Sequence, residues 1–436
     1  MKTKINNAVS LQSNSETERI YICIDLKSFY ASVECAERGL DPLNTNLVVA
    51  DEERTDQTIC LAVSPSMKAL GVKNRCRVYQ IPKQIKYIKA APRMRLYIEY
   101  AANIYAVYLK YAAKEDIHVY SIDEAFIDIT DYLLMYQKTA KEIGINIMKD
   151  ILETTKIPAA CGVGTNLYLA KIALDLVAKR AKNNIGRLDE ETYRAQLWDY
   201  KPLTDFWRVG EGIARRLQPY GIETMRGIAS ADEDLLYRLF GVDAELLIDH
   251  AWGRESVTIA DIKAFQPKHH SLSSSQILPR DYSYEEGRLI VKEMAELLCF
   301  ELVDKGLITD SITLQIGFAY YLEKEPVRGT IQINTACNLA KLILPYADAL
   351  YERIVDKTCP IRRVSLSFSR VYDEVYQQYD LFCNPKQMER ERAMQKTALE
   401  IKKRFGKNAV FKGMNLEKAG TTLQRNRQIG GHKSGE

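Results

Sequence analysis

The sequence predicts an α+β fold divided into more than one domain. Short apolar strands and amphipathic helices alternate irregularly up to about residue 187, and the same mixture returns over residues 271–373. Between these regions, residues 188–258 carry only short helical patterns separated by glycines. A polar stretch, residues 259–270, contains Pro267 and several serines and is predicted to be a linker. A chain of 436 residues is long enough for about two to four domains.

The N-terminal region begins with an extension that we predict to be disordered, because its first 19 residues are polar. Residues 21–25 (YICID) form an apolar run that predicts a buried strand, and the helix after it carries Phe29 and Tyr30. TNLVVADE and TICLAVSP predict two further short strands. The next helix is predicted to end at Gly71.

A long amphipathic helix is predicted after Pro92, because apolar residues recur there at helical spacing. The stretch HVYSIDEAFIDIT alternates as a half-buried strand does, but the adjacent carboxylates of Asp123 and Glu124 interrupt it. A helix over about residues 139–153, a strand in AACGVGTN and a lysine-rich helix in LYLAKIALDLVAKRAK complete this region.

The C-terminal half is predicted to form a smaller α+β domain followed by a basic tail. Strands are predicted in SITLQIGFAYY and IRRVSLSFSRVY, and helices in EEGRLIVKEMAELLCFELVDKG and LAKLILPYADALYERI. A charged helix over about residues 386–405 and a glycine-rich end follow. Residues 386–433 hold 13 basic and four acidic residues, an excess that suits a polyanionic partner and equally a solvated helix face.

The composition indicates a globular protein without membrane segments. Hydrophobic residues make up 46% and charged residues 27% of the chain. No apolar run approaches the roughly 20 residues of a membrane span, and the polar N-terminus lacks the apolar core of a signal peptide. We therefore expect a cytoplasmic protein with no membrane partner. The nine cysteines show no CxxC pair and no zinc spacing, so we expect reduced thiols.

Three acidic residues, Asp25, Asp123 and Glu124, form the most informative pattern. Asp25 ends a buried strand, where an acid is either a helix N-cap or a metal ligand. Asp123 and Glu124 are either solvated acids on an exposed edge strand or a charged pair that needs compensation, because burying an uncompensated charge is costly. Three acids at strand ends can converge on two Mg²⁺ ions, which promote in-line displacement at phosphorus.

Four motifs in this order, IDLKSFYASVE, SIDEAFIDIT, CGVGTNLYLAKIA and WRVGEGIARRL, resemble those of the Y-family DNA polymerases, the low-fidelity enzymes that copy across damaged templates. The resemblance is strongest to the UmuC-like branch of Gram-positive bacteria and their mobile elements, and it extends from about Ile20 to the terminal RNRQIGGHK. It implies a right-hand polymerase with a palm (20–40 and 93–187), short fingers (41–92), a helical thumb (188–258) and, beyond the linker, a little finger (271–373). Residues 374–436 would hold a clamp-binding peptide, the charged helix and the glycine-rich tail.

The resemblance also implies roles for the acids and for the residues around the nucleotide. Asp25 and Asp123 would each bind both Mg²⁺ ions, Glu124 would complete the catalytic site, and the Leu26 carbonyl would add a metal ligand. Tyr30, with Phe29 beside it, matches the steric gate, an aromatic ring that lies under the sugar and excludes a 2′-hydroxyl.

Two lysines are expected on the triphosphate. Lys68 aligns with a phosphate-binding position of the family, although a plain surface lysine is the alternative. Many family members have a phosphate-binding tyrosine three residues earlier, whereas this chain has Pro65, so that hydrogen bond is missing or comes from Ser64 or Ser66. Lys179 is the second expected cation. The segment LDLVAKR is one residue longer than the common spacing, so Arg180 and Lys182 are rivals.

DNA contacts are expected in the thumb and the little finger. WRVGEGIARRL fits a helix-hairpin-helix, in which Val209, Gly210 and Gly212 would form a turn whose backbone N–H groups bind phosphate, and a plain helical hairpin is the alternative. LLYRLFGVDAELLIDHAWG resembles a degenerate second copy. In the little finger, the candidate DNA-binding cations are Arg280, Arg362, Arg363 and Arg370.

The segment QQYDLF matches the short peptide by which bacterial polymerases bind the sliding clamp. Gln378 would fix the register, while Leu381 and Phe382 would enter an apolar groove; packing of Leu381 and Phe382 on their own domain is the alternative. The complete reading is an error-prone polymerase for translesion synthesis in the DNA damage response, with primer–template DNA, dNTP and the clamp as partners. A catalytically weak binding factor and a nucleotidyl cyclase are the other candidates. The intact acidic set argues against a binding factor, because we expect nothing in the protein to neutralise it.

Overall fold

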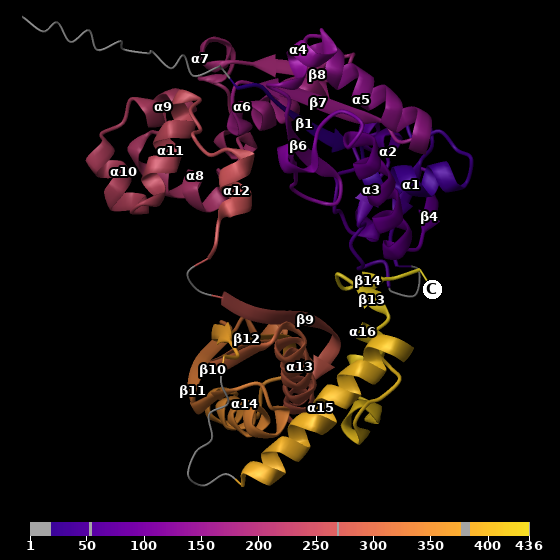
Figure 1. The fold of residues 1–436 in the computed structure, drawn as a ribbon, viewed down its shortest axis with the longest axis vertical. Helices are drawn as coiled ribbons and strands as arrows, with labels where there is room; N and C mark the ends of the chain where they lie inside the picture. The colour runs from indigo at the N-terminus through magenta and orange to yellow at the C-terminus, as the bar shows by residue number, and fades with distance from the viewer. Residues whose placement is uncertain (1–18, 52–54, 268–269, 376–383, 436) are drawn as a thin grey trace, which may run out of the picture. The chain divides into compact units, whose positions relative to one another are not determined.

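The computed structural model of the chain describes residues 19–51, 55–267, 270–375 and 384–435 (Figure 1). It divides into two compact units, and the boundary between them falls after Phe265. The predicted linker at 259–270 is therefore too long, because helix α12 (Ile259–Ala264) occupies its first half. Ile259 is buried in the core of the first unit beside Tyr21 and Phe126, and this apolar contact explains why the segment is helical. Apart from Arg19, the predicted disordered extension lies outside the described residues.

The first unit is built around a five-stranded sheet with the order β5-β6-β1-β7-β8. Strand β1 is antiparallel to both of its neighbours, and β7 and β8 are parallel. Strand β1 is apolar except at Asp25, because helices cover both faces of the sheet. The strands are β1 (Tyr21–Leu26), β5 (Ile117–Val119), β6 (Glu124–Asp128), β7 (Ala159–Gly164) and β8 (Ile185–Leu188).

Glycines in β7 let a helix approach the sheet unusually closely. Cys161 faces Gly144 of α5 (Ala140–Thr155), which packs with α3 (Met94–Tyr108) on one face. Gly162 faces the other way, toward α6 (Leu167–Ile172). A Cβ atom on Gly162 would lie 2.2 Å from the carbonyl oxygen of Ala170, and one on Gly164 would lie 2.1 Å from the Ala170 nitrogen. These contacts place α6 directly against the strand, beside the end of β1.

The stretch HVYSIDEAFIDIT forms two strands, so the prediction of a single strand is wrong. Strands β5 and β6 are joined by a turn in which the amide of Tyr120 donates to the carbonyl of Glu124 at 2.9 Å. Within the turn, the hydroxyl of Ser121 donates to the carboxylate of Asp123 at 2.6 Å. Local hydrogen bonds of this kind favour a turn over an extended strand. Asp123 therefore lies in the turn, whereas Glu124 begins β6.

The rest of the first unit consists of a small sheet with two helices, and a helical region. The sheet has the order β3-β2-β4 and its core is a separate apolar cluster. Its elements are β2 (Leu47–Val49), β3 (Ala62–Val63), β4 (Ile88–Ala90), α1 (Phe29–Glu37) and α2 (Pro65–Ala69). The helical region, as predicted, is made of short pieces around one core: α7 (Glu190–Leu197), α8 (Glu211–Leu217), α9 (Met225–Ala229), α10 (Glu233–Phe240) and α11 (Asp243–Trp252). Helix α4 (Tyr132–Tyr136) follows β6.

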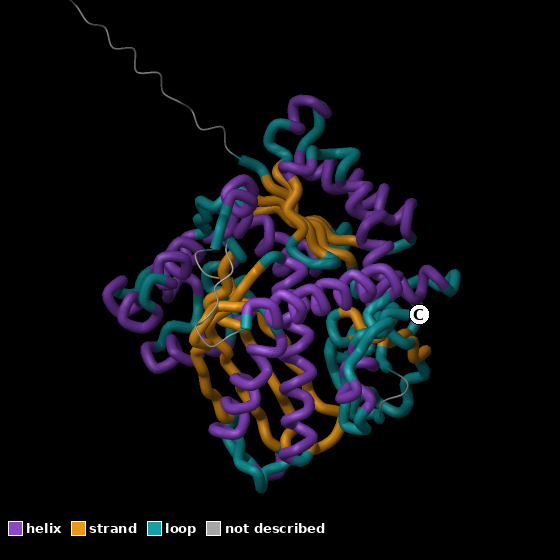
Figure 2. The backbone as a smooth tube through the Cα atoms, turned by 60° about the horizontal axis from the view of Figure 1, so that its bottom comes forward, coloured by secondary structure: helices purple, strands orange, loops and turns teal. Residues whose placement is uncertain are grey.

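The second unit is a four-stranded antiparallel sheet with helices on one face, as Figure 2 shows. The sheet order is β11-β10-β12-β9, and α13 and α14 pack on it and on each other. The elements are β9 (His270–Tyr282), α13 (Tyr284–Lys305), β10 (Leu307–Phe318), β11 (Val327–Cys337), α14 (Ala340–Ile354) and β12 (Ile361–Asp373). The predicted α+β class is confirmed.

The C-terminal tail is folded onto the second unit rather than being only a charged helix. Helix α15 (Pro385–Phe405) packs along α13, and α16 (Thr422–Arg425), β13 (Gln428–Ile429) and β14 (His432–Lys433) follow. Glu293 of α13 is buried and accepts hydrogen bonds of 2.8 Å from the side chain of Asn415 and from the amide of Thr421. No helix in the described ranges is long and apolar enough to cross a membrane.

Candidate active site

Asp25, Asp123 and Glu124 come together at the C-terminal end of β1. Asp25 lies directly opposite Glu124 in the antiparallel pairing of β1 with β6. The amide of Leu26 donates to the carbonyl of Asp123 at 2.9 Å, which ties the turn to the same strand end. Directly opposed residues have Cβ atoms about 5 Å apart, so the carboxylates of Asp25 and Glu124 face one another across two strands.

A buried lysine, Lys171, and a solvent-exposed lysine, Lys179, neutralise these acids. Lys171 of α6 lies 2.8 Å from the Glu124 carboxylate, and Lys179 lies 2.5 Å from the carboxylate of Asp25. A fourth acid, Asp175, joins the lysines, because its two oxygens lie 3.0 Å from Lys171 and 2.7 Å from Lys179. Within the described part of the chain, no three His, Cys, Asp or Glu side chains form a preformed metal cluster.

Burial and pairing shift the pKa values of these groups in different directions. Burial raises the pKa of Asp25, and the neighbouring charge of Asp123 raises it further against the opposing effect of Lys179. Burial also raises the pKa of Glu124, because Lys171 shares its charge with Asp175 and only partly offsets the desolvation. The pKa of Asp175 is lowered, since Lys179 and Lys171 together outweigh the effect of burial.

A π-helical turn explains which of the rival cations reaches the acids. The helix after Ile172 widens into a π turn over Ala173–Val177 and then tightens into a 3₁₀ turn over Ala178–Arg180. A π turn accommodates one extra residue, which is the excess that the sequence spacing indicated. It directs Lys179 toward Asp25, whereas Arg180 donates to the hydroxyl of Tyr200 at 2.5 Å. Lys182 is exposed.

Lys68 belongs electrostatically to the same site, but the serines near it do not. The pKa of Lys68 is lowered, first by desolvation and then by the charge of Lys179, against the raising effect of Asp25. Ser64 is fully buried and caps α2, and its hydroxyl donates to the carbonyl of Thr45 at 2.8 Å. Ser64 therefore cannot replace the missing phosphate-binding tyrosine. Ser66 donates to Asn46 at 2.5 Å and would have to leave that bond.

Tyr30 lies on α1 at the edge of this site. It is half-buried, and the charge of Asp123 contributes to raising its pKa, after burial. Phe29 is buried beside it, with the two ring centroids 5.6 Å apart. Phe29 is thus a core residue of α1, whereas Tyr30 is partly exposed and lies within the electrostatic influence of Asp123.

Comparison with known proteins identifies the family. The impB/mucB/samB family matches residues 24–175, and the C-terminal domain of that family matches residues 269–381. A protein of Bacillus subtilis (strain 168) named "Putative UV-damage repair protein UvrX" is 30% identical over 424 residues, which are 95% of this chain and 97% of that protein. The chain belongs to the Y-family of DNA polymerases.

Further similarities support the assignment to the Y-family and its fold. "DNA polymerase IV 2" of Bacillus subtilis (strain 168) is 28% identical, covering 95% of this chain and 99% of that protein. The solved structure of a "Y-family DNA polymerase chimera Dbh-Dpo4(243-245)-Dbh" superimposes with a TM-score of 0.63 at 22% identity, over 81% of this chain and 99% of the other. The right-hand fold of the Y-family, with its additional C-terminal α+β domain, is therefore the fold of this chain.

The predicted hairpin in the helical region of this Y-family chain differs from the expected pattern at its first helix. Gly210 precedes α8 as its N-cap, Val209 is buried, and a Cβ on Gly210 or Gly212 would meet no atom of the described residues within 4 Å. The element before the turn is only a 3₁₀ turn, Leu203–Asp205. The predicted second copy has full helices on both sides of its turn, α10 and α11, joined at Gly241 with φ of 61°.

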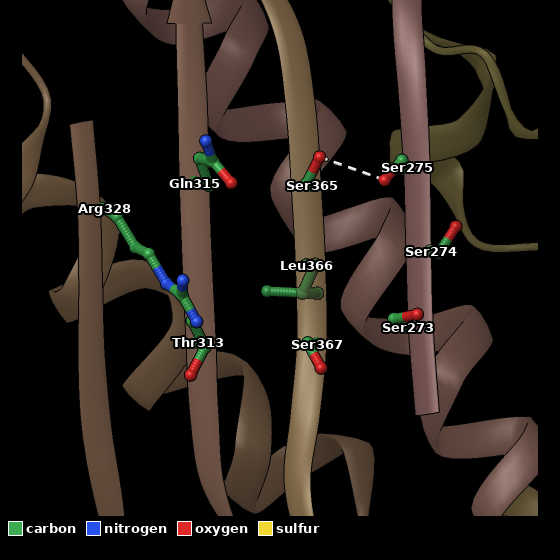
Figure 3. Close-up of a pocket in the computed structure, with 9 residues that line it drawn as sticks. All are labelled: Ser273, Ser274, Ser275, Thr313, Gln315, Arg328, Ser365, Leu366 and Ser367. Atoms are coloured by element: carbon green, nitrogen blue, oxygen red, sulfur yellow. Dashed lines mark hydrogen bonds between the residues drawn. The ribbon is translucent and has the colours of Figure 1, made fainter. Parts of the chain in front are cut away.

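The open face of the sheet in the second unit is lined mainly by hydroxyl groups. Figure 3 shows serines of β9 and β12 side by side, with Ser275 and Ser365 joined by a hydrogen bond of 2.9 Å. The side chain of Arg328 extends from β11 toward Thr313 of β10. The other residues that line this depression are Ser273, Ser274, Gln315, Leu366 and Ser367.

Most of the arginines proposed for DNA binding are paired with acids of the same unit. Arg280 contacts Glu286, Arg362 lies 3.6 Å from Asp281, and Arg370 lies 2.8 Å from Asp310. Among the described residues, neither Arg363 nor Arg328 has an ion pair, and both are exposed. Arg328, Lys171 and Asp175 were not predicted from the sequence. The spacing of Lys171, Asp175 and Lys179, four residues apart along one helix, is a signal that could have found the last two.

The predicted clamp-binding residues lie outside the described residues. Gln378, Leu381 and Phe382 all fall within 376–383.

Proposed function

We propose that Asp25, Asp123 and Glu124 carry out nucleotidyl transfer from a dNTP to a primer 3′-OH in an error-prone, template-directed DNA polymerase for translesion synthesis. The observation that carries this proposal is the opposed pair of Asp25 and Glu124, with Asp123 tied to the same strand end. Family membership supports DNA-directed DNA polymerase activity. A cytoplasmic location and a role in the DNA damage response fit this activity.

The acids fit a pair of divalent metal ions. Y-family polymerases generally use divalent metal ions. Carboxylate and carbonyl oxygens are the ligands that Mg²⁺ prefers, and Asp25, Asp123, Glu124 and the Leu26 carbonyl supply them. Two bound Mg²⁺ ions supply activation of an attacking oxygen and stabilisation of a leaving oxygen. In the protein itself, ion pairs with Lys171 and Lys179 stabilise the partly buried carboxylates of Glu124 and Asp25.

The residues around the acids fit a nucleoside triphosphate. Lys179 can exchange the carboxylate of Asp25 for a phosphate oxygen, and Lys68 is the second cation, because both lie beside the acids. Tyr30 is the proposed steric gate under the sugar. The fingers over 41–92 are small and cannot close tightly on a nascent base pair, so discrimination by shape is weak and errors are tolerated.

DNA and the sliding clamp are the proposed macromolecular partners. The exposed glycines Gly210 and Gly212 offer backbone N–H groups to phosphates, and the hydroxyl-lined sheet face with Arg328 and Arg363 offers uncharged donors and two cations. Contacts of this kind suit an enzyme that accepts any sequence. The peptide containing Gln378, Leu381 and Phe382 is the proposed clamp ligand.

A catalytically weak binding factor is the other candidate, and the structure removes one argument against it. We expected nothing in the protein to neutralise the acids, but Lys171 and Lys179 do so. Primer extension decides between the two candidates. The wild-type protein should add dNTPs to a primer on undamaged and abasic templates only with Mg²⁺, and Asp123→Ala should abolish addition. Primer extension that persists in Asp123→Ala would refute the proposed metal site. Absence of extension by the wild-type protein would favour the binding factor.

A further inference from the structure

The ring of Tyr30 rests on a second aromatic ring that the sequence did not point to. Tyr97 of α3 stacks against Tyr30 of α1, with ring centroids 4.6 Å apart and ring planes inclined by 24°. The side chain of Tyr97 is fully buried, whereas Tyr30 is half-buried. Tyr97 therefore lies on the core side of Tyr30 and limits how far that ring can retreat from the site.

A buried carboxylate fixes Tyr97 in place. The Tyr97 hydroxyl donates to Oε1 of Glu34 at 2.7 Å, and Glu34 is fully buried one helical turn after Tyr30. Arg93 donates to both oxygens of Glu34, at 3.0 and 2.8 Å, and Arg38 pairs with the same carboxylate. Burial raises the pKa of Glu34, but the hydrogen bonds from Arg93, Arg38 and Tyr97 outweigh it, so the net pKa is lowered. An ionised carboxylate held by two guanidinium groups keeps the phenol of Tyr97 in one orientation.

We propose that Tyr97 is a positioning residue for sugar discrimination: anchored by Glu34, it holds the Tyr30 ring where that ring leaves no room for a ribose 2′-hydroxyl. This inference rests on the proposed function, in which Tyr30 lies under the sugar of the incoming nucleotide. Steric exclusion of a 2′-hydroxyl requires a rigidly held side chain, because a side chain that can move makes room for one extra oxygen. Tyr30 is half-exposed, and Tyr97 is the stacked ring that stops its movement toward the core.

The test is single-nucleotide insertion by the full-length protein, measured as kcat/KM for a dNTP and for the matching rNTP. Tyr97→Leu removes the stacked ring, so the ratio of the two values should fall about tenfold, mostly through a lower KM for the rNTP. Tyr97→Phe keeps the stacked ring but loses the hydrogen bond to Glu34, so the ratio should fall by no more than about threefold, less than in Tyr97→Leu. Tyr97→Met also removes the ring, and its flexible side chain adapts better to the space left, so it carries the same test if the leucine variant folds poorly.

Tyr100→Leu is the matched control. Tyr100 also belongs to α3 and bonds to α1, through Glu37 at 2.7 Å, without stacking on Tyr30. Its replacement should leave the ratio unchanged, and an equal fall would overturn the inference, because it would show a general effect of helix packing. In a Tyr30→Ala background, Tyr97→Leu should add nothing to the loss of discrimination; a further fall of similar size would also overturn it.

The two levels of the proposal fail differently. If Tyr30→Ala lowers the ratio but the Tyr97 leucine and methionine variants do not, the role of Tyr97 is wrong and the gate stands. If Tyr30→Ala leaves the ratio unchanged, the gate assignment itself fails, and the inference falls with it.

Discussion

Lys171 and Glu124 form a buried ion pair 2.8 Å long, in which each side chain is about one-tenth exposed. The pair joins the helix after β7 to the strand that carries the acidic site. Lys171 also contacts Asp175, which in turn contacts Lys179, and Lys179 contacts Asp25. One chain of five charges therefore links two of the three candidate acids to this helical segment. This chain lets a cluster of acids stay buried in the protein alone.

Lys171→Met should destabilise the first unit strongly. The substitution keeps the length of the side chain but leaves Glu124 and Asp175 buried without their shared cation, a loss that typically costs about 3–5 kcal/mol. Urea unfolding measures it. Lys149→Met is the control, because Lys149 pairs with Glu153 at an exposed i, i+4 position, where less than about 0.5 kcal/mol is expected. Equal losses in the two variants would contradict the assigned role of Lys171.

Lys179 should be the cation that binds the triphosphate. Lys179→Ala is expected to lower kcat/KM for dNTP insertion by about a hundredfold, because a charge-assisted bond to phosphate is lost. Arg180→Ala and Lys182→Ala should stay within about threefold of wild type, since neither side chain faces the acids. Steady-state insertion kinetics check all three. A larger loss in Lys182→Ala than in Lys179→Ala would refute the register set by the π turn.

Glu286 should make the second unit sensitive to acid. Arg280, followed by the amide and hydroxyl of Ser283, lowers the pKa of Glu286 to about 2, against a smaller effect of burial. A carboxyl whose pKa is lower in the folded than in the unfolded protein stabilises the fold above its unfolded pKa. That stabilisation is lost as the pH falls from about 5 toward 2.

Glu286→Gln can keep the capping box of α13 but loses the negative charge that Arg280 stabilises. It should therefore cost about 1 kcal/mol at pH 7 and progressively less toward pH 2. Thermal unfolding at a series of pH values measures the difference. Glu285→Gln, one residue earlier and 76% exposed, should change little at any pH. A cost for Glu286→Gln that is independent of pH would exclude the ionic part of this explanation.

Arg328 should contribute more to DNA binding than Arg280. Arg328 lies on the hydroxyl-lined face without an ion pair among the described residues, whereas Arg280 is engaged by Glu286. Arg328→Ala should weaken binding of primer–template DNA and reduce the salt dependence by about one charge. Arg280→Ala should change that slope less. Fluorescence anisotropy over a range of salt concentrations distinguishes the two, and identical slopes would argue against this face as the DNA surface.

The clamp peptide should act independently of catalysis. Replacing Leu381 and Phe382 by alanine removes both apolar anchors, so binding to the bacterial sliding clamp should fall by at least about a hundredfold. Primer extension without clamp should be unchanged. Surface plasmon resonance measures the first effect. Retained clamp binding would mean that these two residues pack elsewhere.

The parts of the site that sequence predicts best are those encoded locally. The apolar run that ends at Asp25 predicts a buried strand with an acid at its end, and the structure has that strand. The alternation in HVYSIDEAFIDIT gave no sign of the turn, because the apolar pattern continues on both sides of it. The turn is stabilised by the hydrogen bond from the Ser121 hydroxyl to the Asp123 carboxylate. The predicted linker was too long for a related reason. Thr258 and Asp261 cap α12 locally, but the burial of Ile259 in the same core cluster as the distant Tyr21 does not show in the local sequence.

Contacts between segments far apart in the sequence account for what was missed. In the sequence, nothing distinguishes Lys171 from the other lysines of its helix. Its role depends on the packing of α6 beside Glu124. Tyr97 looks like an ordinary apolar position of an amphipathic helix, and its stacking on Tyr30 depends on how α1 and α3 cross. The glycine-rich tail suggested no structure, yet Glu293, more than a hundred residues earlier, anchors it.

Because of Gly162 and Gly164, the residues of this protein that tolerate few substitutions are not limited to its charged residues. A single added carbon at either position would strike the backbone of α6, so the helix would have to move outward and carry Lys171 with it. In a library of random variants, these two glycines should tolerate as few replacements as the acids do, although neither carries a functional side chain. A damaging substitution at either glycine would look like a packing defect, although its first effect would be to move the charge of Lys171 away from Glu124.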